Sequence, residues 1–342
     1  MKTIFLKVFM VVCMVGLFSH VADAQTKKRT VKKRTTAKKT TNSRTRANIA
    51  PAAKVDTAVV VAPPHIDSLP MVNVKKSLRN DGAIVRNLVK DRVPLPYEDL
   101  REDDAVYMQK VWREIDTREK MNLPFRYSAN ENNGNQRFIS ILFKAIQDGP
   151  DNGGVTVFSG IDDRFTTPMT VGEVAKVISG DPVTVPITDS LGNVVSYKTT
   201  NPEVNLDSFY KFQIKEEVIF DKESSRLFWR ILGIAPLKRI ITASGVDLGE
   251  SPLFWVYYPD MRPIFAKYEV YNGKNYGARM SWEELFESRM FYGRIIKSTL
   301  DNPYDQFLSQ QTGLKQSSIL QLLEGETIKD KIFNYEQNLW SY

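Results

Sequence analysis

The chain has 342 residues, of which 25% are charged, and its formal net charge is +7. It contains one cysteine, Cys13, and two histidines, His20 and His65. Cys13 and His20 lie in a leader that we expect to be removed, and His65 lies in a proline-rich segment. The mature chain therefore lacks the side chains for Cys–His catalytic dyads, for a serine triad in a folded core and for zinc sites built from Cys and His.

Residues 1–24 have the layout of a cleavable secretory signal. Lys2 and Lys7 precede an apolar run over residues 8–18, and a small-x-small pattern ends at Ala24, just before Gln25. The apolar run is too short to span a bilayer. We predict cleavage between Ala24 and Gln25 and export of the mature chain.

Residues 25–54 contain eleven basic side chains and no acidic one, whereas residues 55–342 carry a net charge of about −5. A run of like charges interleaved with threonine cannot bury enough apolar area to offset chain entropy, so we predict a disordered basic tail. Two interpretations stay open, a solvated spacer and an electrostatic tether to an anionic surface. The candidate tether residues are Lys27, Lys28, Arg29, Lys32, Lys33, Arg34, Lys38 and Lys39.

Four prolines and no aromatic residue occur between residues 47 and 72. Proline at this density disfavours helices and central strands, so we predict that an extended linker continues the tail to residue 72. Alternatively, the valine run at residues 59–61 adds as an edge strand to another subunit.

Residues 73–342 hold nearly all of the aromatic side chains, and their first half predicts three helices. The first begins at the acidic residues 102–104 and carries apolar residues at helical spacing to Ile115. The second spans residues 136–147, ends at Gly149 and is apolar around most of its circumference, so it should be central. Thr170 and Glu173 form a capping box for the third, which ends near Ser179.

The second half predicts antiparallel strands followed by helices. One hairpin pairs residues 183–187 with 194–197. A second, with one buried face, pairs 212–220 with 227–234, and 253–258 and 264–271 add two strands. Ser281 and Glu284 cap a helix that carries Leu285, Phe286, Phe291, Ile295 and Ile296, and residues 303–342 form short helices. The fold class is α+β: residues 73–342 form one compact domain, or two intimately packed subdomains, with antiparallel hairpins packed against helices and preceded by the disordered basic tail.

No strong signal for a chemical site is present. Residues 148–153 begin like a calcium loop, but Pro150 and Ser159 stand where ligands are required, so a turn is expected. An acid–base carboxylate pair would have to come from residues such as Asp162, Asp163, Glu216 and Glu217. Adjacent residues of a strand point to opposite faces, which separates Glu216 from Glu217, and Asp162 and Asp163 lie beside Arg164 as in a loop ion pair. We predict no catalytic residue, metal, cofactor or nucleic-acid partner.

The five tryptophans divide into core and contact candidates. Trp112, Trp229, Trp255 and Trp282 occur in amphipathic segments, where burial is the usual role. Trp340 and Tyr342 lie at the chain end, which seldom packs deeply, so we predict that they contact a partner.

Several long segments together resemble the conserved domain of the GldN/PorN family. The first is RVPLPYEDLREDDAVYMQKVWREIDTREKMNLPF at residues 92–125. It is followed by NQRFISILFKAI, GVTVFSGIDDRFTTPMT, YPDMRPIFAKYEVYN and FESRMFYGRIIKSTLDNPYDQ. The resemblance covers roughly residues 80–342 and contains no short catalytic signature.

This resemblance implies a non-enzymatic periplasmic component of the type IX secretion and gliding machinery of Bacteroidetes. Members self-associate in large rings with an outer-membrane lipoprotein, the K component, on the periplasmic face of the outer membrane. They also contact the M component, an inner-membrane protein linked to the motor. Contact with the membrane is then only peripheral, and no contact residue is carried over from the family.

Two other functions stay open from the residues alone. A periplasmic carboxylate-dependent glycan hydrolase would need two acids about 5–10 Å apart in a cleft. A binding module for cell-wall polymers or other polyanions would act through the basic tail.

Overall fold

The computed structural model describes residues 69–79, 82–83, 91–180, 183–188, 194–200, 204–241, 245–273, 275 and 277–340. The signal peptide with its Ala24–Gln25 cleavage site, the basic tail, the valine run and Tyr342 lie outside these residues. Among the helices of the described part, none combines the length and apolar character needed to cross a bilayer.

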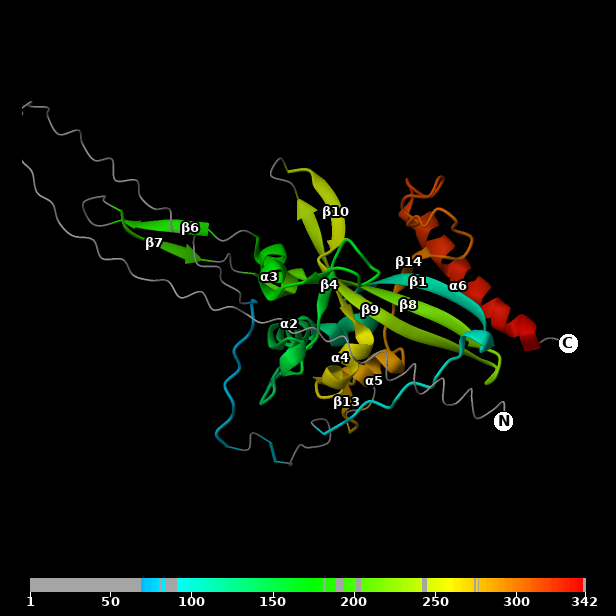
Figure 1. Cartoon of the computed structure of the whole chain (residues 1–342), viewed down its shortest axis with the longest axis horizontal. Coiled ribbons are helices and arrows are strands. Elements are labelled where there is room, and N and C mark those ends of the chain that lie inside the picture. The colour runs from blue at the N-terminus through cyan, green and yellow to red at the C-terminus, as the bar shows by residue number, and fades with distance from the viewer. Residues whose placement is uncertain are drawn as a thin grey trace, which may run out of the picture. The chain divides into compact units, whose positions relative to one another are not determined.

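An antiparallel sheet of eight strands forms the centre of the described chain (Figure 1). Its strand order is β14-β1-β8-β9-β11-β4-β5, and β10 pairs with β9. These strands are β1 (Ala105–Asp116), β4 (Val157–Ser159), β5 (Pro168–Met169), β8 (Lys211–Asp221), β9 (Arg226–Ile241), β10 (Asp247–Pro252), β11 (Phe254–Tyr257) and β14 (Arg294–Ser298). Three two-stranded sheets are formed by β2 (Asn130–Glu131) with β3 (Gly134–Asn135), β6 (Val183–Thr188) with β7 (Val194–Thr200), and β12 (Glu269–Val270) with β13 (Met280–Ser281).

The helices are short except for the last. The α-helices are α2 (Phe138–Asp148), α3 (Val171–Ser179), α4 (Tyr258–Phe265), α5 (Trp282–Glu287) and α6 (Ser318–Trp340). The 3-10 helices are η1 (Glu102–Asp104), η2 (Lys120–Arg126), η3 (Pro150–Asn152) and η4 (Leu206–Ser208). Helices beside an all-antiparallel sheet confirm the predicted α+β class.

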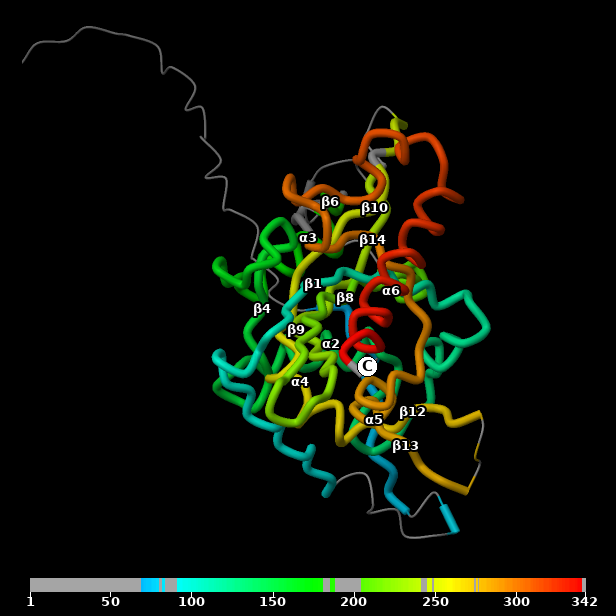
Figure 2. The backbone as a smooth tube through the Cα atoms, turned by 90° about the vertical axis from the view of Figure 1, so that its right-hand side faces the viewer, coloured from blue at the N-terminus to red at the C-terminus, as the bar shows by residue number. Residues whose placement is uncertain are grey.

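Two hydrophobic clusters share one face of the sheet, toward its two ends. Figures 1 and 2 show the helices that belong to them, α2, α4 and α5 in one cluster and α6 in the other. At one end, α2, α4 and α5 cover β1 and β8 with an aromatic core that includes Phe138 and Trp282. At the other end, α6 lies against β14 and packs Ile328 and Ile332 on Val111. The opposite face carries a smaller cluster of Trp112, Ala235 and Trp255.

Between the two large clusters, on the same face, lies a buried carboxylate. Glu216 is fully buried and pairs with Arg113 at 2.7 Å and with Arg289 at 2.9 Å. Trp229 lies beside both guanidinium groups, which are 5.0 and 4.9 Å from the centre of its ring. A charge removed from water in this way requires partners, so this cluster joins β1, β8 and the segment after α5 into one unit.

The helix predicted from residue 102 is wrong beyond its first turn. Only η1 is helical, and residues 105–116 form strand β1, which is hydrogen-bonded on both sides, to β8 and β14. Val111 and Trp112 are both buried, on opposite faces of the sheet. A strand with apolar residues on both faces can imitate the three- and four-residue spacing of a helix, and tertiary pairing decides between them.

The hairpin of β8 and β9 is confirmed, but the prediction that only one of its faces is buried is wrong. On the face opposite Glu216, Gln213 and Lys215 are 3% and 6% exposed. The loop over residues 160–167 covers this face, where the Lys215 ammonium donates to the carbonyl of Asp163 at 2.7 Å.

The strand predicted over residues 264–271 is mostly wrong. Helix α4 occupies residues 258–265, and only Glu269–Val270 form a strand. Pro259 stands in the first turn of α4, where its missing N–H is not needed, so it favours a helix start.

The C-terminal helices also differ from the prediction. The capping box of Ser281 and Glu284 is present, but α5 ends at Glu287, and Ile295 and Ile296 belong to strand β14. Arg289 has a φ of 53°, which is incompatible with continuing the helix. The short helices predicted over residues 303–342 are replaced by turns and the single 23-residue helix α6.

Local signals were read correctly where one turn decides the structure. Helix α2 ends at Gly149, whose φ of 67° suits glycine, and its N–H donates to the carbonyl of Ala145. Helix α3 has the predicted capping box of Thr170 and Glu173 and ends at Ser179. Strands β6 and β7 form the first predicted hairpin. Residues 150–152 form a 3-10 turn, as expected for the sequence that begins like a calcium loop.

The folded part of the chain begins before residue 73. Leu69 is 5% exposed, belongs to the core cluster of α2, and donates its N–H to the Gln147 side chain at 3.1 Å. The predicted linker is therefore held against the domain at this position.

Candidate functional site

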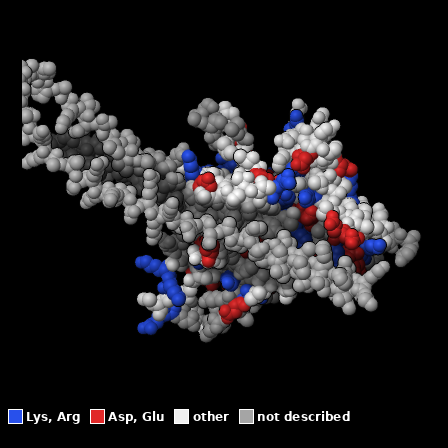
Figure 3. Space-filling view, in the orientation of Figure 1, with Lys and Arg blue, Asp and Glu red and all other residues white. Residues whose placement is uncertain are grey.

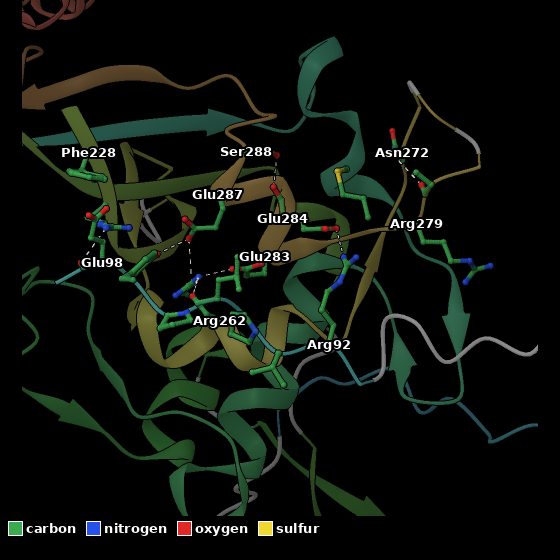
Figure 4. Close-up of a pocket in the computed structure, with 18 residues that line it drawn as sticks. Arg92, Glu98, Phe228, Arg262, Asn272, Arg279, Glu283, Glu284, Glu287 and Ser288 are labelled. Atoms are coloured by element: carbon green, nitrogen blue, oxygen red, sulfur yellow. Dashed lines mark hydrogen bonds and ion pairs between the residues drawn. The ribbon is translucent and has the colours of Figure 1, made fainter. Parts of the chain in front are cut away.

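A pocket of about 850 Å³ lies where residues 92–98 cross α4 and α5 (Figure 4). We call residues 92–98 the strap. Pro94 and Pro96 fix their own φ angles and push the preceding residues into extended conformations, so the strap runs as extended chain. The Arg262 guanidinium of α4 donates to the carbonyl of Leu95 at 2.9 Å, which attaches the strap to the helix beneath it.

Arg262 is the centre of a buried ion-pair network. It donates to Glu283 at 2.7 Å, and both residues are 7% exposed. Its Nε lies 3.4 Å from Oε1 of Glu287, and Figure 4 shows Arg262 pointing toward Glu283 and Glu287 of α5. Burial lowers the pKa of Arg262, but the hydrogen bond to Glu283 and the neighbouring acidic groups outweigh this effect, so its pKa is raised. The guanidinium therefore stays charged.

Tyr97 attaches the strap to the same network. Its ring lies between two guanidinium groups, with Arg262 at 3.8 Å and Arg230 at 4.1 Å from the ring centre. Its hydroxyl donates to Glu287 at 2.6 Å, and Tyr258 donates to the same oxygen at 3.0 Å. Burial, followed by the hydrogen bond to Glu287, raises the pKa of Tyr97 well above its usual value.

The carboxylates of α5 are thus already engaged by other side chains. Glu283 accepts from Arg262, Glu287 accepts from both tyrosines and lies in an ion pair with Arg262, and Glu284 pairs with Arg92 at the start of the strap. An acid–base catalyst needs a carboxyl that can exchange a proton with a substrate. The geometry suits a clamp that fixes the strap better than it suits a hydrolytic pair.

Replacing Tyr97 with phenylalanine should lower the free energy of unfolding at pH 7 by about 1–2 kcal/mol, because a hydrogen bond to a charged group is lost. The raised pKa also gives a pH dependence. Above pH 10 the unfolded chain loses the Tyr97 proton while the folded chain keeps it, so stability falls as pH rises, and the variant should show a smaller fall. Urea denaturation at pH 7, 10 and 11 measures both effects. Tyr304→Phe is the control, because Tyr304 is 82% exposed. If the free energy of unfolding depended on pH equally in wild type and Tyr97→Phe, the clamp would be contradicted.

The carboxylates named from the sequence do not form one site. Glu216 lies in the buried cluster with Arg113 and Arg289, whereas Glu217 points to the other face of β8, 4.0 Å from Lys110. The Asp163 carboxylate accepts from the Trp112 indole at 2.7 Å and lies 3.7 Å from Lys215.

Asp162 is engaged within its own loop. It accepts from the backbone N–H of Arg164 at 2.9 Å and from Thr166. In the described part of the chain, no group of three or more His, Cys, Asp or Glu side chains is placed to hold a metal ion.

The tryptophans lie mainly where the sequence indicates. Trp112, Trp255 and Trp282 are buried in the core, and Trp229 is half-buried between two arginines. Trp340 is the last residue of α6, but its side chain and Tyr342 lie outside the described parts, so their partner contact stays a prediction.

The outer face of α6 is a surface that the sequence analysis missed. It exposes apolar side chains, and the most exposed are Ile319, Leu323 and Phe333, at 69%, 57% and 56%. Exposed apolar residues gathered on one helix mark a contact surface.

Acidic and basic side chains are interspersed over the face shown in Figure 3, so neither sign of charge dominates the described surface there. The four apolar residues at 319, 320, 322 and 323 are a signal for the outer face of α6, but a segment predicted to form short helices gives them no common face.

The strap network had no comparable signal. Tyr97 and Arg262 are 165 positions apart, and neither stands in a motif of known chemistry. Only the folded chain shows that they meet.

The sequence matches a family model described as gliding motility associated protein GldN over residues 100–341. No curated protein matches the chain. The matched region includes the eight-stranded sheet, α4, α5 and α6, and it begins after the strap. Because the family model matches most of the length of the chain, the chain belongs to the GldN family, a family of components of the gliding and type IX secretion machinery.

Proposed function

We propose that this protein is a non-enzymatic structural subunit of the type IX secretion machinery. In this proposal it is periplasmic and associates peripherally with the outer membrane. It self-associates in a ring with a lipoprotein of the K type and contacts the motor-linked inner-membrane protein of the M type. Family membership over residues 100–341 is the observation that carries the proposal.

The physical features of the chain are compatible with this role. A ring requires two different, complementary surfaces on each subunit, and the apolar side chains exposed elsewhere on the described chain, such as Val106, Met108 and Met121, are available for such contacts. The leader predicted over residues 1–24 would direct export. Cys13 stands in the middle of the apolar run and not at its end, so the proposal assigns the membrane anchor to the partner lipoprotein.

Capture from the cell envelope tests the proposal. The chain, tagged at its native locus, should co-purify from gently solubilised envelopes with an outer-membrane lipoprotein and an inner-membrane protein of the secretion machinery, identified by mass spectrometry. A tag exported by residues 1–24 alone is the control and should capture neither. Recovery of the tagged chain without either protein would contradict the proposal.

A further inference from the structure

Helix α6 has two different faces. The inner face packs on the sheet through Ile328 and Ile332, and Gly325 brings the helix close to β14. A Cβ at Gly325 would lie 3.0 Å from the carbonyl oxygen of Ile295, tighter than most real contacts. The position of α6, and with it the direction of its outer face, is therefore fixed by close packing.

The outer face carries a stripe of four residues, Leu322, Glu326, Lys329 and Phe333. Their spacing of four, three and four residues places them on one side of the helix, as in the contact seam of a coiled coil. Leu322 and Phe333 are 44% and 56% exposed. The side chains of Glu326 and Lys329 are 43% and 53% exposed and form an ion pair of 2.9 Å within the helix.

This stripe is complementary to itself when two copies run antiparallel. Placing Leu322 opposite Phe333 of a second copy also places Glu326 opposite Lys329. A two-fold axis that passes near Thr327 of both helices repeats each contact. The two paired helices then make two apolar contacts at the ends of the stripe and have four alternating charges in its middle. An unrelated apolar helix would bury the Glu326–Lys329 ion pair without offering either charge a partner across the contact, which is costly.

We propose that α6 binds α6 of a second copy of this chain, antiparallel and in this register. The stripe borders a groove of about 410 Å³, which Glu326, Lys329 and Phe333 line together with Trp229 and Tyr292. The contact is isologous, so it closes at two copies and differs from the heterologous contact that a ring requires. It does not depend on the proposed function.

Charge reversal in the purified mature chain tests the pairing by sedimentation in low salt. Wild type should sediment with the mass of two copies. Glu326→Lys and Lys329→Glu each place like charges opposite one another and should weaken association at least tenfold. An equimolar mixture of the two variants should regain the two-copy mass, and so should the double variant, because opposite charges again face each other.

Arg239→Glu is the matched control. It breaks an exposed ion pair with Asp247 on β9 and β10, and it should leave the mass unchanged. Circular dichroism checks that every variant is folded. A wild type that stays a single copy at all concentrations, single variants that associate like wild type, or a mixture that fails to recover would each overturn the proposal. None of these results bears on envelope capture, so the proposed function is tested separately.

Discussion

Replacing Glu216 with glutamine is expected to lower the free energy of unfolding by about 3 kcal/mol. Glu216 is fully buried and accepts from Arg113 and Arg289, so the variant leaves two guanidinium groups without their countercharge. Arg113 is 9% exposed, whereas the Arg289 side chain is 33% exposed and can turn toward water. The effect should therefore lie at the lower end of the range for broken buried pairs.

The neighbouring Glu217→Gln is the matched control for this experiment. Glu217 lies on the opposite face of the same strand and has only a 4.0 Å pairing with Lys110, so its replacement should cost less than about 1 kcal/mol. Urea denaturation of both variants at pH 7 measures the difference. Equal losses would show that the arginine cluster between the two hydrophobic clusters does not hold the sheet.

Replacing Trp282 with alanine should lower the free energy of unfolding by about 3–5 kcal/mol, as large-to-small core substitutions do. Trp282 is fully buried, and its ring centre lies 5.0 Å from that of Phe138 and 5.2 Å from that of Phe125. Its indole also donates to the carbonyl of Gln136 at 3.1 Å, which would lose its partner. Thermal and urea denaturation measure the loss.

Tyr304→Ala is the control for this substitution, since Tyr304 is 82% exposed and should cost less than about 0.5 kcal/mol. A loss below about 1 kcal/mol for Trp282→Ala would contradict the central position of the aromatic core.

Sequence reasoning succeeded where a few neighbouring residues decide the structure. The capping boxes at Thr170 and Ser281 and the glycine end of α2 are local, and each begins or ends a helix where predicted. It failed where distant chain segments decide. Strand β1 reads as a helix because both its faces are apolar, and only its pairing with β8 and β14 makes it a strand.

The candidate sites follow the same division. The separation of Glu216 from Glu217 follows from strand geometry, and it was predicted. The strap network joins Tyr97, Arg230 and Arg262 across more than a hundred residues, and no local pattern indicates it. The stripe on α6 has a readable period, but it is recognisable only once residues 318–340 are known to form one helix.

The strap and α6 suggest a division of tasks within the described chain. In the strap network, the charges of arginines and glutamates are paired and both tyrosines donate to Glu287, so the network holds the strap against the domain. Helix α6 is anchored on its inner face and exposes apolar and charged residues on its outer face, so it is placed to contact another molecule.

The central claim is that this protein is a structural subunit of a ring. Electron microscopy of the particles that co-purify from envelopes with the tagged, full-length chain tests this claim most directly. The account predicts closed rings that contain many copies of the chain together with the lipoprotein. Particles that contain a single copy of the chain and no lipoprotein would contradict it.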